Sequence, residues 1–136
     1  MDDKLKESLD KAVNSGKNAA ENIKNISKIV TKQMAEQSKA QGDDLRKSSA
    51  VVFKDIVNSL GELGKGSVDY IKAVGHGIHE GLKESGAEDN NLLKSTGDTI
   101  IEGLKGLGEA GLFVTKETVK SVSGSIKNIF NNKKDS

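Results

Sequence analysis

The residues best suited to chemistry are two histidines and two nearby acids in the middle of the chain: Asp69, His76, His79 and Glu80. On a helix, positions 69, 76 and 80 share one face, and His76 and Glu80 form an i,i+4 pair. Imidazole and carboxylate groups arranged in this way can hold a transition-metal ion if a neighbouring helix adds a ligand. His76, His79 and Glu80 are therefore the metal-site candidates. We favour the simpler interpretation, two solvated histidines on a polar face, because the paired Glu-x-x-His motifs of di-metal bundles are missing.

Other catalytic patterns are weaker. None of the serines sits in a Gly-x-Ser-x-Gly nucleophile elbow. The string Gly64-Lys65-Gly66-Ser67 has the composition of a phosphate-binding loop, but it lacks the preceding strand and the Gly-x-x-x-x-Gly-Lys-Ser/Thr spacing. We therefore predict a protein that is not an enzyme, with no catalytic residue, no cofactor-binding residue and no cofactor.

The composition favours helices around a thin core. The chain has 136 residues, which is about one domain, and it contains no proline to force a helix break. It also has no cysteine, which excludes disulfides and thiolate metal sites and suits a reducing compartment. Since 34% of the residues are hydrophobic and 30% are charged, a thick globular core is out of reach.

Charge and targeting signals narrow the partners. Basic and acidic residues, 21 and 20 in number, are interspersed and give a net charge of +1, so no cationic field would attract nucleic acid. The start of the chain has acids where a signal peptide needs positive charge. No run approaches the roughly 18 apolar residues of a membrane span. We expect a cytoplasmic protein, either free or peripheral to a membrane or granule surface.

The hydrophobic pattern predicts an all-α single domain, 1–136, built from three long amphipathic helices at about 3–40, 44–85 and 91–131, with a polar tail at 131–136. Each helix would be about 60 Å long. Equal lengths and short connections predict an antiparallel three-helix (up-down-up) bundle or a helical hairpin. The strongest break lies at 86–91, where a C-cap glycine precedes acids and asparagines. The alternative is a helix that continues through 86–91, because an eleven-residue rhythm keeps its phase there.

That rhythm is the main pattern of the chain. Eleven residues make three helical turns, so residues spaced by eleven stay on one side of a nearly straight helix. We predict that they form a helix-packing seam. Its members are Gly64, Gly75, Gly97 and Gly108 together with the apolar row Leu60, Ile71, Leu82, Leu93 and Leu104.

The glycines need a physical reason, since each costs roughly 1 kcal/mol relative to alanine inside a helix. Twelve of the fifteen lie between residues 61 and 111. One explanation is close packing of two helix backbones, for which the pairs Gly77 with Gly81 and Gly61 with Gly64 supply faces. The alternative is a soft middle region that folds only against a surface or a partner.

The eleven-residue rhythm from 45 to 130 resembles that of late-embryogenesis-abundant proteins, exchangeable apolipoproteins and perilipins. The mixture of lysine, glutamate, serine and small residues in a proline-free chain also resembles phasins, which coat storage granules. This likeness implies amphipathic helices on a lipid or granule surface. The high glycine content departs from all of these families.

Our leading functional hypothesis is a non-enzymatic structural or scaffolding protein that uses the seam for helix–helix association. Three thin helices carry few large side chains, which favours a homo-oligomer or a helical protein partner. The alternative is a peripheral amphipathic coat on a lipid or storage-granule surface, where the apolar stripe would meet lipid instead of another helix.

Overall fold

The structure, a computed structural model, describes residues 3–38, 43–87, 89–110 and 114–131. Throughout these ranges the chain is helical and has no strand, which confirms the predicted all-α class. The helices are α1 (Asp3–Val13), the short 3-10 helix η1 (Gly16–Asn18), α2 (Ala19–Ser38), α3 (Asp43–Glu62), α4 (Val68–Glu84), α5 (Asn90–Ala110) and α6 (Lys116–Phe130).

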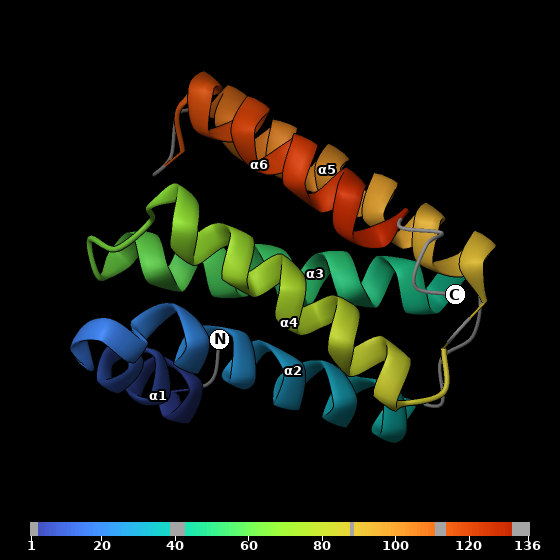
Figure 1. The fold of residues 1–136 in the computed structure, drawn as a ribbon, viewed down its shortest axis with the longest axis horizontal. Helices are drawn as coiled ribbons and strands as arrows, with labels where there is room; N and C mark the ends of the chain where they lie inside the picture. Colours follow the sequence, from blue (N-terminus) through green and yellow to red (C-terminus); the bar gives the residue numbers. More distant parts are fainter. Residues whose placement is uncertain (1–2, 39–42, 88, 111–113, 132–136) are drawn as a thin grey trace.

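The helices form three successive hairpins, α1–α2, α3–α4 and α5–α6, stacked side by side (Figure 1). The even helices pack on one another in the order α2, α4, α6, and the odd helices pack in the order α1, α3, α5. The core lies between these two layers. Its largest fully buried side chains include Leu9, Phe53, Ile56, Ile71, Ile78 and Leu104.

The prediction of three uninterrupted helices is wrong, because each of them is divided near its middle. The range 3–40 is broken at 14–18, where Gly16 has a φ of 65°. The range 44–85 is broken at 63–67, where Gly64 has a φ of 73°. Glycine adopts this left-handed conformation without the steric cost of a Cβ, so the chain can leave the helix at these positions. The third break lies before α6, where residues 114 and 115 are not helical; residues 111–113 lie outside the described part.

Side-chain caps fix where the next helices begin. The Ser67 hydroxyl accepts a hydrogen bond from the backbone N–H of Tyr70 at the start of α4. The Thr115 hydroxyl does the same for Thr118 at the start of α6, at 3.1 Å. Each cap satisfies one of the backbone N–H groups that the first turn of a helix leaves without a partner.

The predicted break at 86–91 is confirmed, and a helix that continues through it is wrong. Gly86 has a φ of 95° and follows the end of α4. The Asp89 carboxylate then accepts hydrogen bonds from the backbone N–H groups of Asn91 (2.8 Å) and Leu92 (3.2 Å), which caps α5. The break predicted between the first two long helices, at 41–43, lies outside the described part except for Asp43, which begins α3.

The structural repeat is the hairpin, with a period of 48 residues, and not the eleven-residue segment. The caps Ser67 and Thr115 are 48 positions apart, and so are the turn glycines Gly16 and Gly64. Apolar residues of α2, α4 and α6 recur at the same spacing. They are Ile23, Ile71 and Val119; Ile26, Val74 and Val122; Val30, Ile78 and Ile126; and Met34, Leu82 and Phe130.

Candidate functional site: the helix-packing seam and the outer face of the first hairpin

Gly77 and Gly81 lie where α4 comes close to the backbone of α2. A Cβ built at Gly77 would collide with the backbone carbonyl oxygen of Lys24 and would lie 2.6 Å from Cβ of Ser27. A Cβ at Gly81 would lie 2.8 Å from the carbonyl oxygen of Lys28. Four residues further along α4, from Gly77 to Gly81, the contact also moves four residues along α2, from Lys24 to Lys28. The two helices therefore run parallel. The predicted Gly77–Gly81 packing face is therefore present, inside the molecule.

Three glycines of the predicted seam also lie at helix contacts, and all three face α6. A Cβ at Gly75 would lie 3.2 Å from Cγ1 of Ile126. At Gly97 it would lie 2.6 Å from Cβ of Phe130, and at Gly108 it would lie 2.6 Å from Cγ2 of Val119. The apolar row is buried as well: Leu60, Ile71, Leu82, Leu93 and Leu104 are each at most 5% exposed.

Gly64 does not belong to the seam, and its predicted role there is wrong. It lies in the exposed turn between α3 and α4, and a Cβ built on it would meet no atom within 4 Å. Its positive φ is what the turn requires. The neighbouring Gly64-Lys65-Gly66-Ser67 string is thus a helix end followed by an N-cap.

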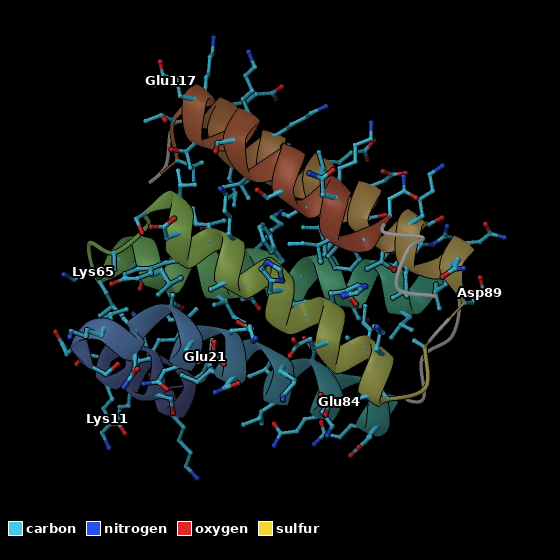
Figure 2. All side chains as sticks on the ribbon, viewed as in Figure 1. Lys11, Glu21, Lys65, Glu84, Asp89 and Glu117 are labelled. Atoms are coloured by element: carbon cyan, nitrogen blue, oxygen red, sulfur yellow. The ribbon has the colours of Figure 1, made fainter. Side chains whose placement is uncertain are left out.

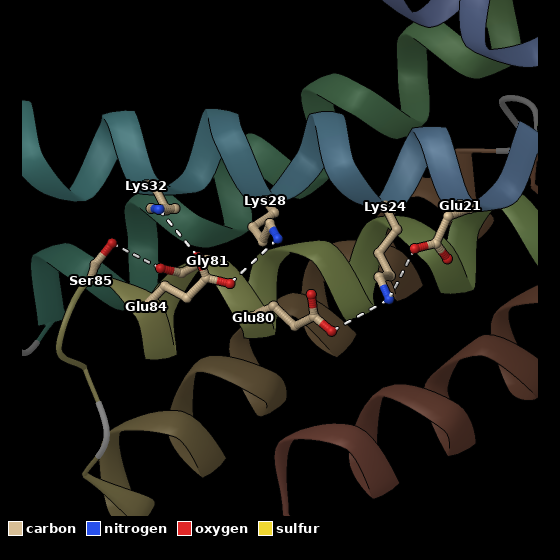
Figure 3. A network of polar contacts seen from close by, with 8 residues as sticks. All are labelled: Glu21, Lys24, Lys28, Lys32, Glu80, Gly81, Glu84 and Ser85. Atoms are coloured by element: carbon tan, nitrogen blue, oxygen red, sulfur yellow. Dashed lines mark hydrogen bonds and ion pairs between the residues drawn. The ribbon is translucent and has the colours of Figure 1, made fainter.

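A ladder of lysines and glutamates runs along the edge of the α2–α4 contact (Figure 3). Lys24 pairs with Glu80 at 3.4 Å, while Lys28 and Lys32 both pair with Glu84, at 3.4 and 3.2 Å. Both sets of charges recur every four residues, which is one helical turn. The ladder therefore fixes which turn of α4 lies beside which turn of α2, while the glycines set how close the helices come.

Charge pairing also changes the acidity of Glu84. The hydrogen bond from Lys32 holds the pKa of the Glu84 carboxyl below its ordinary value of 4.5, with a further contribution from Lys28. The pairs are partly exposed, with side-chain exposures between 27% and 45%, so salt screens them.

The three metal-site candidates do not converge. Glu80 is paired with Lys24, and the His79 ring packs edge-on against Phe130 with centroids 4.9 Å apart. His76 lines a shallow groove between α2 and α4, where burial and the nearby Lys24 lower its pKa. Within the described residues, no group of three or more histidine, aspartate or glutamate side chains is placed to hold a metal ion.

Ile29 on α2 and the two grooves beside it form a surface that we call the outer face of the first hairpin. Ile29 is 51% exposed and stands as a ridge between two grooves formed where α1 crosses α2. The first, the Leu5 groove, lies beside Ile29 and is also lined by Lys4, Leu5, Ser8, Ile26, Val30 and Gln33. The second, the Lys11 groove, is lined by Ser8, Lys11, Ala12, Asn22, Asn25 and Ile26. Sequence reasoning missed this face because it treated 3–40 as one helix; the Asn14-Ser15-Gly16 string was the signal for the turn.

Comparison with known proteins identified no matching family, no matching curated protein and no matching solved structure. In the part of the chain that the structure describes, no helix is both long enough and apolar enough to span a membrane.

Proposed function

We propose that this protein is a non-enzymatic helical scaffold that binds other helices and forms a homo-oligomer. The observation that carries the proposal is the outer face of the first hairpin. Its apolar ridge at Ile29 and the two flanking grooves have the shape that receives a helix. On the side of α2 that contacts α4, Gly77 and Gly81 allow the two helix backbones to pack closely. The binding surface is thereby held on a closely packed frame, which limits the entropy lost on association.

Sedimentation velocity over a range of about 1 to 200 μM tests this proposal, since self-association makes the sedimentation coefficient depend on concentration. We expect a weight-average mass that rises with concentration. A single monomeric species throughout would refute the homo-oligomer.

The alternative function, a coat on a lipid or granule surface, requires a different state of the chain. The rows that would meet lipid include Leu60, Ile71 and Leu82, which are fully buried between the two layers. The hairpins would therefore have to separate on the surface. Circular dichroism and flotation with anionic vesicles distinguish the two functions: we expect unchanged helicity and no flotation, whereas a helicity change with flotation would support the coat.

A further inference from the structure

The face of α2 around Ile29 is less covered than the equivalent positions of the next hairpin. In the described residues α1 has 11 residues, against 20 in α3 and 21 in α5. Ile26 and Val30, which flank Ile29 on α2, are only partly buried. Their equivalents 48 positions later, Val74 and Ile78, are fully buried. The surface around Ile29 is thus an apolar position on which a further helix would pack.

We propose that a second copy of this chain occupies this position, in a two-fold dimer centred on Ile29. The inference rests on the proposed function and names its surface and its partner. A two-fold axis beside Ile29 sets the two α2 helices antiparallel, so that the two exposed Ile29 side chains meet at the axis and bury each other. The same surface of each copy then forms both sides of the contact, which is what a two-fold interface requires.

Charge supports the second copy as the occupant. Lys11 lies in the groove beside Asn22, seven residues before Ile29, and Figure 2 shows it on the side of the first hairpin away from the rest of the stack. Glu36 is exposed seven residues after Ile29, two turns along the same helix. An antiparallel pairing centred on Ile29 places position 22 of one copy opposite position 36 of the other. Lys11 of each copy thereby meets Glu36 of the other, and within the described residues neither forms an ion pair of its own.

The opposite end of the stack differs in chemistry, which disfavours head-to-tail assembly. The exposed side chains of α6 are polar or charged and include Lys116, Glu117, Lys120, Lys127 and Asn128. Among the described residues, the exposed side chains of α6 therefore offer Ile29 no apolar partner, and we expect a closed dimer rather than an open filament.

The first experiment compares two matched substitutions in sedimentation velocity. Ile29→Asp places a charge at the centre of the interface, while Val51→Asp changes the other strongly exposed apolar residue, which is 56% exposed on α3. We expect Ile29→Asp to weaken dimerisation by about 100-fold, since two isoleucines per dimer lose their burial. Val51→Asp should leave dimerisation unchanged. Both sites are exposed in the monomer, and unchanged circular dichroism verifies the fold.

The second experiment tests the two-fold geometry by charge reversal. In Lys11→Glu alone, or in Glu36→Lys alone, like charges meet twice per dimer, and we expect each variant to dimerise about tenfold more weakly. An equimolar mixture of the two variants restores an opposite-charge pair at both contacts. We therefore expect the mixture to form heterodimers about as strong as the wild-type dimer.

The outcomes separate this inference from the proposed function. A wild-type chain that stays monomeric overturns both. If Ile29→Asp leaves self-association intact, only the two-fold dimer is overturned and the scaffold proposal stands. The same holds if the mixture of the two charge variants fails to form heterodimers. Growth beyond a dimer that both single charge variants leave unaffected would indicate head-to-tail stacking instead.

Discussion

In the α2–α4 contact, glycine faces the backbone of the neighbouring helix, whereas in the contacts of α6 glycine faces side chains. Gly77 meets a carbonyl oxygen of α2, but Gly75 meets Ile126 and Gly108 meets Val119. A side chain can change its rotamer to admit a methyl group, while a helix backbone can only move as a whole. The same residue type therefore sets the distance between helices in one region and makes room for a large side chain in the other.

The largest effect is expected at the backbone contact. Gly77→Ala places its methyl group against the carbonyl of Lys24, so α2 and α4 must separate. We expect the free energy of unfolding to fall by about 1–3 kcal/mol. Urea unfolding measures the change. The control is Gly106→Ala on α5, whose Cβ meets no atom within 4 Å and which should gain up to about 1 kcal/mol from better helix propensity. Equal gains at both sites would contradict the close approach.

At the side-chain contacts, the size of the new residue decides the effect. Gly75→Leu and Gly108→Leu should each lower the free energy of unfolding by about 1–3 kcal/mol, because the added side chain overpacks the contact with α6. Gly75→Ala should cost less than Gly77→Ala, since Ile126 can adjust by a few tenths of an ångström. Thermal unfolding of the four variants provides the ranking. Stabilisation by both leucines would mean that α6 does not pack on these glycines.

Gly64 provides a third case, in which conformation matters and space does not. Gly64→Ala should cost about 1 kcal/mol, because the φ of 73° disfavours any Cβ. Gly64→Leu should cost about the same, since no atom lies within 4 Å of the Cβ position. Unfolding midpoints of the two variants therefore distinguish a turn glycine from a packing glycine. A much larger cost for leucine than for alanine would show that Gly64 packs against a neighbouring helix.

The smallest effect concerns the charge ladder. The folded-state pKa of Glu84 is lowered, so its stabilising contribution is present above pH 4.5 and is lost as pH falls through the folded-state pKa. Glu84→Gln should therefore be less stable than wild type at pH 7, with a difference that shrinks below pH 4.5 and in high salt. Glu102→Gln, which removes an exposed carboxylate of α5, is the control. A pH-independent difference would show that Glu84 acts through packing.

The sequence allowed the core and the break at 86–91 to be predicted, but not the turns at 14–18 and 63–67. The buried row from Leu60 to Leu104 was predictable because helical periodicity depends on local spacing. The break at Gly86 was predictable because glycine, acids and asparagines stand together there. The turn at Gly64 was missed because this glycine keeps the eleven-residue phase. Only the following Ser67, an N-cap residue, indicated that a new helix begins.

The seam was only partly predictable, for a related reason. Gly75, Gly97 and Gly108 share an eleven-residue spacing, which indicates a common face but not the helix that packs on it. The partner, α6, was hidden while 91–131 was treated as one helix, since a helix cannot pack on itself. The four-residue spacing of Gly77 and Gly81 did indicate close packing. The Lys24–Glu80 and Lys28–Glu84 pairs depend on which helices are neighbours, and local patterns do not contain that information.

The stacking of hairpins also determines how the molecule comes apart. In the described residues, the main contacts between hairpins join neighbours in the stack, so the cost of local opening is approximately a sum of neighbour terms. The α3–α4 hairpin has neighbours on both sides, whereas α1 is short and bounds the stack at one end. Opening should therefore begin at the ends and reach α3 and α4 last, with amide hydrogen exchange slowest in the middle hairpin.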